Sequence, residues 1–272
     1  MILEKKSKYS KYSKYNLLLR DDELADAMPE TKRFNKTTFM EMLSKYKTII
    51  VKPRVGSNGY KVLKITENKA QYVLHNSKKE EIFKDVSMLY GRVKKITKSR
   101  KFLVQQYIPL AKINDRPFDI RAIVQRKIGF DWAVTGMYAK VANKGFFITN
   151  LRTKSKVIEV NKAILDSNID FEDEIDVEDI HTKLHSIVLK TAGIFGEAFN
   201  NQTIWGLDLG IDQTGKVWII EANSRPGYKG FRMLKNKANY RMIKSIKKHN
   251  KMHREKISSQ EEIESKSQNE ET

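Results

Sequence analysis

Three oxygen-bearing side chains stand on two neighbouring apolar segments in the C-terminal half of the sequence. Asp208 lies in the first segment, and Glu221 and Asn223 lie in the second. A turn at 213–215 would fold the segments into a β-hairpin, on which Glu221 and Asn223 share a face. A two-residue loop places Asp208 opposite Glu221, whereas a three-residue loop shifts the register by one residue. Carboxylate and amide oxygens suit an Mg²⁺ ion that also binds phosphates, although an edge hairpin with a solvated acidic face would show the same pattern.

A lysine followed by a glycine-containing loop is the second candidate site. Lys52 ends an apolar segment, and the loop after it contains Gly56, Ser57, Asn58 and Gly59. Such a loop can lay backbone N–H groups over phosphates while the lysine ammonium supplies a point charge. It is not a P-loop, because no Gly-Lys-Ser or Gly-Lys-Thr follows it. A plain hairpin turn is the alternative.

The segment Phe-Asp-Ile-Arg at 118–121 is the third candidate. Asp119 and Arg121 share one face of the expected strand, and apolar residues occupy the other face. The planar guanidinium of Arg121 is suited to binding an anion. A structural salt bridge is the alternative.

These candidates sit among helices and strands in which β-hairpins dominate. Thr38 and Glu41 form a capping-box pattern, which predicts a helix that ends near Tyr46. Periodicity and turn residues predict strands over 48–52, 60–66, 70–75, 102–108, 118–128 and 130–141, the last two joined by a turn at 127–129. They predict helices over 78–93, 176–199 and 238–256. Hairpins favour an α+β fold with antiparallel sheets over a doubly wound sheet.

The composition is that of a globular and strongly basic protein. The 272 residues include 40% hydrophobic residues, no Cys, and a formal net charge of +19. Without Cys the chain forms no disulfide and uses no thiol in catalysis, which favours an intracellular, cytoplasmic location. No apolar run is long enough to span a membrane. The charge points to polyanionic partners such as nucleic acid, a nucleotide or an acidic polymer.

Both ends of the sequence are basic. Residues 1–20 contain three Ser-Lys-Tyr repeats and are expected to form a flexible arm or an edge segment. Residues 238–256 combine an apolar stripe with many lysines and arginines, so we expect a packed helix with a solvated basic face, and nucleic-acid binding is the alternative. The chain then turns acidic, and the tail over 246–272 is expected to be partly disordered.

In their chain order, these motifs resemble those of the ATP-grasp superfamily, and within it the YheC/YheD group of endospore-coat-associated proteins. The resemblance runs over residues 8–245 and includes Lys52 with its loop, Met28–Thr31, Gln105-Gln106, Arg116–Arg121, Thr135-Gly136-Met137 and Glu221–Gly227. It implies an ATP-grasp domain over 21–245 that binds a nucleotide between two lobes. The small lobe would span 45–105 and the large lobe 106–235.

The resemblance also implies a role for each candidate residue. Lys52 would bind the α- and β-phosphates of ATP, and the loop of Gly56, Ser57, Asn58 and Gly59 would close over them. The strand of Gln105, Gln106, Tyr107 and Ile108 would bind adenine through backbone groups of Gln106 and Ile108. Asp208, Glu221 and Asn223 would hold Mg²⁺. Arg121 and Arg225 would be catalytic by neutralising the transferring phosphoryl group, a reaction that needs mainly positioning and charge.

Four features depart from the family pattern. Gln105 stands where many ATP-grasp enzymes have Glu, and Asp115 is the only carboxylate in the region expected to bind the ribose. The residues 151–155 replace a common pair of glycines. The segment before Met28 is too short for a separate substrate-binding domain, so we expect the lobes or a partner to bind the acceptor.

The function implied by the resemblance is that of an ATP- and Mg²⁺-dependent carboxylate–amine ligase, which forms an acyl phosphate and then an amide and releases ADP. Its carboxylate and amine substrates are unknown, and the net charge makes an acidic peptide a candidate. Two alternatives stay open. One is a non-catalytic, ATP-binding structural protein of the spore coat, and the other is a basic nucleic-acid-associated protein.

Overall fold

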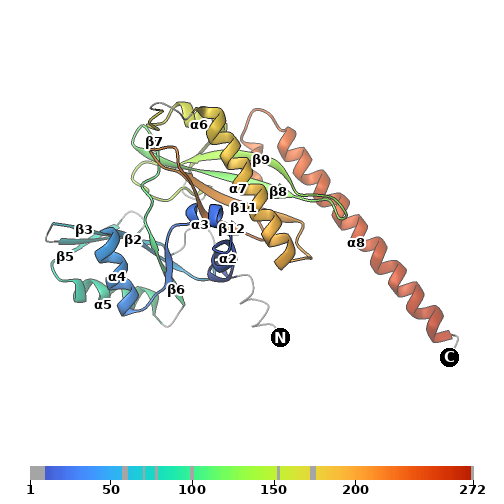
Figure 1. Cartoon of the computed structure of the whole chain (residues 1–272), viewed down its shortest axis with the longest axis horizontal. Coiled ribbons are helices and arrows are strands. Elements are labelled where there is room, and N and C mark those ends of the chain that lie inside the picture. Colours follow the sequence, from blue (N-terminus) through green and yellow to red (C-terminus); the bar gives the residue numbers. More distant parts are fainter. Residues whose placement is uncertain are drawn as a thin grey trace.

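Two antiparallel sheets, each with its own helices, form two lobes (Figure 1). The computed structural model describes residues 10–56, 61–69, 71–76, 79–98, 101–151, 154–171 and 176–270, with side chains up to residue 260. The predicted α+β class with antiparallel sheets is confirmed. Within these ranges, no helix is both long enough and apolar enough to cross a membrane.

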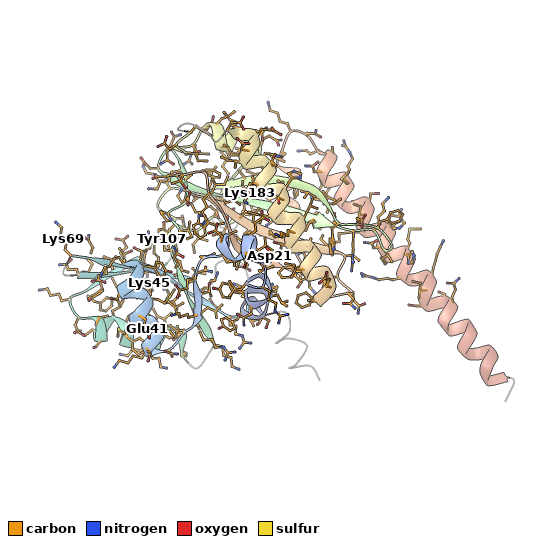
Figure 2. The ribbon with its side chains drawn as sticks, in the orientation of Figure 1. Asp21, Glu41, Lys45, Lys69, Tyr107 and Lys183 are labelled. Atoms are coloured by element: carbon orange, nitrogen blue, oxygen red, sulfur yellow. The ribbon has the colours of Figure 1, made fainter. Side chains whose placement is uncertain are left out.

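The small lobe is a six-stranded sheet with two helices on one face. In chain order its strands are β1 (Thr31–Arg33), β2 (Thr48–Pro53), β3 (Leu63–Asn68), β4 (Gln71–Asn76), β5 (Lys79–Phe83) and β6 (Phe102–Gln106), and their order in the sheet is β1-β6-β2-β3-β4-β5. Helices α4 (Lys36–Tyr46) and α5 (Val86–Thr97) bury Phe39, Leu43 and Leu89 in its core. The exposed side of α4 carries Glu41 and Lys45 (Figure 2). Since β1 belongs to this sheet, the lobe's elements begin before residue 45.

The start of α4 differs from the prediction. Asn35, not Thr38, is the N-cap: its Oδ1 accepts a hydrogen bond from the Thr38 N–H at 2.9 Å. The Thr38 hydroxyl accepts from the Asn35 N–H at 3.2 Å, which completes the capping box. The box is therefore present but begins three residues earlier, because Asn competes well with Thr for this position.

The predicted helix over 78–93 was wrong in its first part. Residues 79–83 form the edge strand β5, in which Phe83 pairs with Tyr72 of β4. The helix begins only after Asp85, whose side chain accepts a hydrogen bond from the Met88 N–H at 2.8 Å. Two adjacent apolar residues, Ile82 and Phe83, fit a helical spacing as well as a strand, and pairing to β4 decided between them.

The large lobe is a second antiparallel sheet, with the order β10-β9-β8-β11-β12 and β7 paired to β8. Its strands are β7 (Lys112–Ile113), β8 (Arg116–Gln125), β9 (Ala133–Val141), β10 (Lys156–Ile158), β11 (Ile204–Ile211) and β12 (Val217–Asn223). Helices α7 (Val177–Ala198) and α6 (Val160–Leu165) cover one face, as predicted for 176–199. The predicted turn after β8 is present, with Phe130 N–H bonded to the Lys127 carbonyl at 3.0 Å, but β8 already ends at Gln125.

The two faces of this sheet have different chemistry because side chains alternate along β8. Phe118, Ile120 and Ala122 face α7 and are fully buried. Asp119 and Arg121 face the opposite way. That second face is covered at one end by the 3₁₀ turn η2 (Lys229–Arg232) and the start of α8 (Ala238–Glu270), which pack in one small core. The remainder of the face turns toward the small lobe (Figure 1).

The hairpin of β11 and β12 places Asp208 directly opposite Glu221, by an unexpected route. Ile211 pairs with Val217, which is the register of a three-residue loop. That register would leave Asp208 opposite Ile220. A β-bulge between Leu209 and Asp208 takes up Ile220 as an extra residue and restores the Asp208–Glu221 pair.

The two termini also differ from the prediction. Residues 11–18 form helix α2 (Lys11–Leu18) and are followed by α3 (Asp22–Asp26), so the described part of the basic arm is helical and is not an edge strand. Lys190 of α7 forms ion pairs with Asp21 and Glu23, both at 2.9 Å. Figure 2 shows Asp21 near α3 and Lys183 on α7. At the other end, α8 continues to Glu270 where partial disorder was expected, and it projects away from both lobes (Figure 1).

A candidate nucleotide site in the cleft between the lobes

A cavity of about 710 Å³ lies between the two sheets. The small lobe contributes Lys52, Gly56 and Gln105, the connection to the large lobe contributes Gln106, Tyr107 and Ile108, and the large lobe contributes Asp119, Arg121, Lys140, Asp208, Glu221, Asn223 and Arg225. The structure thus brings together the described residues that the sequence singled out. Ser57, Asn58 and Gly59 lie outside the described residues.

Lys52 reaches the cavity from the end of β2 and is buried. Its ammonium donates hydrogen bonds to Gln105 Oε1 at 2.7 Å and to the Ile220 carbonyl at 3.3 Å. Burial, together with the nearby charge of Lys11, lowers the pKa of Lys52 to about 8. A lysine held in this way has little solvation to lose when an anion arrives.

Gln105 holds Lys52 in place. While its Oε1 accepts from Lys52, its Nε2 donates to Thr31 Oγ1 at 2.7 Å, and that hydroxyl donates to the Pro29 carbonyl at 2.9 Å. The residue is buried within this chain of hydrogen bonds. Gln105 therefore positions the lysine.

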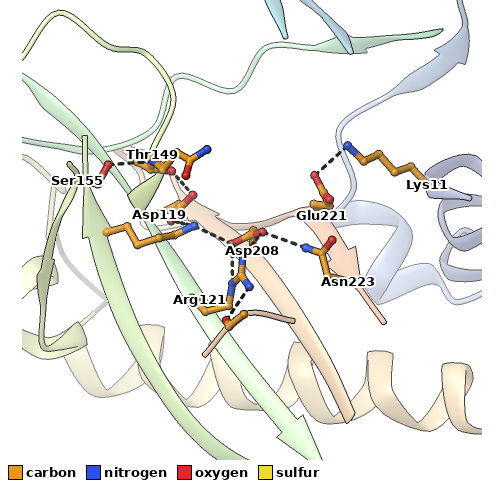
Figure 3. Close-up of polar contacts among 11 residues, drawn as sticks. Lys11, Asp119, Arg121, Thr149, Ser155, Asp208, Glu221 and Asn223 are labelled. Carbon is orange, nitrogen blue, oxygen red and sulfur yellow. Dashed lines mark hydrogen bonds and ion pairs between the residues drawn. The ribbon is translucent and has the colours of Figure 1, made fainter. Parts of the chain in front are cut away.

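Asp208 is the centre of a buried charge cluster on the large lobe (Figure 3). Arg121 approaches it from β8 with two hydrogen bonds of 2.9 Å, and Lys140 of β9 donates to Oδ1 at 2.9 Å. Burial alone would raise the pKa of Asp208, but the charges of Arg121 and Lys140 hold it well below the usual range. Asp208 is therefore a carboxylate at neutral pH.

Lys140 is a site residue that the sequence reasoning missed. It pairs across the sheet with Asp119 and lies 3.0 Å from its Oδ1. The Asp119 Oδ2 accepts a hydrogen bond from Thr149, whereas Oδ1 receives no hydrogen bond of good geometry. Burial raises the pKa of Asp119, and the nearby Asp208 raises it further. The available signal was a single lysine in the buried strand 133–141, whose other residues are mostly apolar or small.

The predicted magnesium ligands meet at the hairpin. Asn223 Nδ2 donates to Asp208 Oδ2 at 3.3 Å, and a half-turn of the amide would present its oxygen instead. Glu221 Oε2 faces Lys11 Nζ at 3.2 Å. No group of three His, Cys, Asp or Glu side chains that could hold a metal occurs in the described residues. Two carboxylates and one amide fit a hard cation that takes its remaining ligands from phosphates and water.

Two close backbone approaches shape the cavity wall. A Cβ at Gly206 would lie 2.3 Å from Pro226 Cβ, so only glycine lets the loop after β12 cross the sheet there. That loop brings the Gly227 carbonyl to Arg121, which donates to it at 3.3 Å, and it carries the exposed Arg225. A Cβ at Gly210 would lie 2.3 Å from a Leu110 methyl group, so the connection between the lobes also depends on a glycine.

The connection between the lobes offers a backbone edge. The Tyr107 N–H donates to the Thr48 carbonyl at 3.3 Å, and the Gln106 N–H donates to the Glu30 carbonyl at 2.9 Å. The Ile108 N–H has no backbone acceptor within the described segments. Tyr107 lies between the lobes (Figure 2), and Lys64 stands 4.1 Å from its ring centroid. Gly56, which lines the cavity, has a φ of 136°, a backbone conformation that suits glycine.

The geometry supports binding of a polyanion with an attached planar group. The cavity lining combines the backbone of Ile108 and the ring of Tyr107 with Lys52, Arg121 and Lys140, three cations held by neighbouring side chains. Preorganised cations of this kind stabilise charge that develops during phosphoryl transfer.

Comparison with known proteins agrees with this description. A family model described as YheC/D like ATP-grasp matches residues 3–252. The chain is 25% identical over 220 residues to the endospore coat-associated protein YheD of Bacillus subtilis, covering 78% of this chain and 47% of that protein. It is 24% identical over 207 residues to YheC of the same organism, covering 74% and 55%. The chain thus spans about half the length of these relatives.

More distant similarities reach enzymes. The chain is 28% identical over 149 residues to the coenzyme gamma-F420-2:alpha-L-glutamate ligase of Methanococcus maripaludis, covering 55% of this chain and 41% of that enzyme. Among solved structures, the L-amino acid ligase from Bacillus licheniformis superposes with a TM-score of 0.47 at 14% identity, covering 82% of this chain and 42% of that one. The ADP complex of an N5-carboxyaminoimidazole ribonucleotide synthetase gives 0.46 at 11% identity, covering 80% and 45%.

Proposed function

The chain belongs to the YheC/D-like ATP-grasp family, and from this membership we propose that it is an ATP- and Mg²⁺-dependent ligase that joins a carboxylate to an amine. One observation carries the proposal. Lys52 of the small lobe and Arg121, Lys140 and Asp208 of the large lobe line a single cavity, so charged groups from both lobes would surround a triphosphate bound there.

In this proposal the small lobe binds and the large lobe supports the reaction. Lys52, fixed by Gln105, holds the α- and β-phosphates, and the Ile108 N–H binds the adenine edge. Arg121 and Lys140 share the carboxylate of Asp208 and are therefore held side by side toward the transferring phosphoryl group. Arg225 approaches from the loop after β12. Such charge neutralisation is the main requirement of phosphoryl transfer.

Asp208, Glu221 and Asn223 would hold Mg²⁺, which neutralises phosphate charge when it is bound. In the ligase reaction, a donor carboxylate oxygen attacks the γ-phosphorus and the bond to ADP breaks. The acceptor amine nitrogen then attacks the acyl carbon, inorganic phosphate leaves and an amide forms. The donor carboxylate and the triphosphate are both anions. Fixed cations in the cavity would stabilise them by replacing the water that they lose on binding.

The charge distribution favours an acidic peptide as a substrate. Arg225, Lys229 and Arg232 are exposed and line the cavity beside Tyr228 and Tyr240. Seven exposed basic residues continue outward along α8, namely Arg241, Lys244, Lys247, Lys248, Lys251, Arg254 and Lys256. Among the α8 side chains that the structure describes, Lys251 alone pairs with a carboxylate, that of Glu255 at 3.5 Å. A peptide rich in Glu or Asp supplies both the counter-charge and a reactive carboxylate.

The same proposal extends to location. We place the protein in the cytoplasm or at the spore coat, since the two Bacillus subtilis relatives carry the name endospore coat-associated. Nucleic acid is the weaker candidate partner, because it offers no carboxylate to this chemistry.

The direct test is ADP release from ATP and Mg²⁺ on a panel of amino acids and acidic peptides. Hydroxylamine added to the reaction should trap an acyl phosphate as a hydroxamate. Lys52→Met is the control that removes the phosphate site, and it should abolish both signals. ATP binding by the wild type without ADP release or hydroxamate on any substrate would instead favour the non-catalytic, ATP-binding alternative.

A further inference from the structure

Two pairs of histidines each stand one helical turn apart. The chain has five His, and four of them form the pairs His181–His185 on α7 and His249–His253 on α8. Residues four apart in sequence are neighbours on one face of a helix. Two imidazoles placed in this way can bind one divalent transition-metal ion, the arrangement that zinc-binding helices use.

The α7 pair has the ring separation that a shared metal ion requires. A zinc–nitrogen distance of about 2.0–2.1 Å puts the ion about 3.2 Å from each ring centroid, so two rings that bind a tetrahedral ion lie about 5.2 Å apart. The ring centroids of His181 and His185 are 5.0 Å apart. Those of His249 and His253 are 6.4 Å apart, although their spacing in the sequence is the same. Only the α7 pair therefore already stands at the tetrahedral separation.

The imidazoles of the α7 pair are free to bind an ion. Both are partly exposed, and within the part of the chain that the structure describes neither forms a hydrogen bond or an ion pair. Burial and the neighbouring His181 lower the pKa of His185, so this side chain is neutral at pH 7, the form that binds metals. On α8, by contrast, His253 Nδ1 is buried without a hydrogen-bond partner, so only its other nitrogen can meet an ion from solvent.

The charges of α7 are arranged to suit a cation at this pair. A helix turns about 100° per residue, so the two lysines of α7, Lys183 and Lys190, lie on the opposite side of the helix from the histidines. Both lysines form ion pairs with acidic side chains at the start of α3. The exposed Glu178 lies one turn before His181 on the histidine side, and its charge reaches His185. A cation at the pair would therefore meet a carboxylate charge and no lysine of its own helix.

We propose that His181 and His185 form a binding site for a divalent transition-metal ion such as Zn²⁺, with water as the remaining ligands. Helix α7 packs on the face of the large-lobe sheet opposite the cleft, so this site is separate from the proposed magnesium site. It is also chemically distinct, because imidazole suits Zn²⁺, Cu²⁺ and Ni²⁺, whereas oxygen ligands suit Mg²⁺. A bound ion would join two turns of α7 and stabilise the folded large lobe. The inference does not depend on the proposed ligase activity.

The test is a calorimetric titration of the full chain with Zn²⁺, in the absence of nucleotide and after metal has been removed by a chelator. Wild type is compared with His181→Gln, with His185→Gln and with the double variant. Glutamine keeps a polar side chain at each position and removes the imidazole. The matched control combines His249→Gln with His253→Gln, which removes the other pair of the same sequence spacing.

Loss of either α7 histidine should weaken Zn²⁺ binding by more than about tenfold, since even the loss of a side chain that only supports a metal ligand costs that much. The double α7 variant should bind about as weakly as either single variant, because the two imidazoles act as one chelating unit. The control should bind Zn²⁺ as wild type does. Zn²⁺ should also raise the melting temperature of wild type and control more than that of the α7 variants.

Three outcomes would overturn the site. They are no Zn²⁺ binding by the wild type, equal Zn²⁺ affinity in the wild type and the α7 variants, and an equal loss of affinity in the control, which would show that the ring separation does not matter. A measurement on the wild type alone covers the case in which a variant folds poorly. Electron paramagnetic resonance of one equivalent of bound Cu²⁺ should show coupling to two imidazole nitrogens, and coupling to fewer would contradict the proposal.

Discussion

Lys52 shows how a proposed phosphate-binding residue can oppose stability. Its ammonium is buried with two neutral acceptors and with no carboxylate at hydrogen-bond distance among the described residues, so burial lowers its pKa from 10.5 to about 8. Below its folded pKa the residue is charged in the nucleotide-free protein at a cost to folding. A bound triphosphate would supply the missing counter-charge.

For Lys52→Met we therefore expect a nucleotide-free protein that is at least as stable as wild type at pH 7. Affinity for ATP should fall by about 1.5–3 kcal/mol, the contribution of a hydrogen bond to a charged group, while adenosine should bind both forms alike. The unfolded lysine holds its proton up to about pH 10.5 and the folded one only up to about pH 8. Wild-type stability relative to the variant should therefore rise between these two pH values. Urea unfolding at several pH values measures this, and a fall over that range would contradict the assignment.

The two carboxylates proposed to bind the metal differ in their contribution to the stability of the fold. Asp208 is buried and neutralises both Arg121 and Lys140, whereas Glu221 is partly exposed and faces Lys11 alone. Asp208→Asn leaves two buried cations short of a partner, so it should cost about 3–5 kcal/mol of unfolding free energy. Glu221→Gln should cost little stability and should remove the Mg²⁺-dependent part of the ATP-induced rise in melting temperature. Equal destabilisation by the two variants would contradict this division.

Residues of the candidate site could be predicted where they belong to a short sequence motif. They could not be predicted where a contact between distant segments brings them into the cavity. Lys52, Arg121, Asp208 and Glu221 stand in recognisable short patterns, and the cavity gathers all four. Lys140 enters through a cross-strand pair with Asp119, and Lys11 enters through the packing of a helix. Neither contact leaves a local mark in the sequence, because each joins segments that are distant along the chain.

At the scale of elements, the hairpin of β11 and β12 depends on close packing against its loop. Gly206 of β11 touches Pro226, and the same loop carries Arg225 and offers the Gly227 carbonyl to Arg121. The added methyl group in Gly206→Ala would need to lie 2.3 Å from Pro226 Cβ, so the loop must move.

We expect Gly206→Ala to destabilise the protein by about 1–3 kcal/mol, the usual cost of overpacking. Because the displaced loop borders the phosphate position, ATP affinity should fall as well. Gly193→Ala is the control, since a Cβ there meets nothing within 4 Å and the residue lies within α7. Denaturant unfolding and calorimetric ATP binding measure both effects. A Gly206→Ala variant with the stability of Gly193→Ala would show that the loop yields without cost.

Helices and strands were predicted correctly in long segments with a regular apolar pattern. The predictions failed where contacts with distant segments determine whether a segment is a helix or a strand. The helix over 176–199 was predicted to within a residue at each end, since its apolar stripe repeats over its whole length and Asp176 caps it. The edge strand β5 and helix α2 were missed. Residues 79–83 become a strand by pairing with β4, and the repeats near 10–18 become a helix by docking against β12 and α7. The bulge at Ile220 could not be foreseen, although the Asp208–Glu221 pair was.

At the scale of the whole molecule, helix α8 contributes a run of exposed basic side chains to the net charge of +19. The first turns of α8 pack on the large lobe through Ile243, and Asn250 is buried further along. Between and beyond these anchors the helix presents basic side chains outward, and Lys247 lies 4.6 Å from the ring centroid of Tyr228, which lines the cavity. Helix α8 therefore presents a basic surface that approaches the cavity at Tyr228.

This surface predicts electrostatic recruitment of an acidic substrate. Changing Lys244, Lys247, Lys248 and Lys251 together to Gln should weaken binding of a fluorescent Glu-rich peptide and flatten its dependence on salt between about 50 and 200 mM. ATP affinity should not change, because none of the four lines the cavity. The control changes Lys79, Lys84, Lys94 and Lys95 to Gln, which removes the same charge from exposed positions on the small lobe. Equal weakening of peptide binding by both quadruple variants would show that only the net charge matters. Tighter binding of an oligonucleotide of equal charge would show that the α8 surface binds nucleic acid. If only the α8 variant loses affinity, and only for the peptide, then α8 binds the acidic substrate and brings it to the cleft.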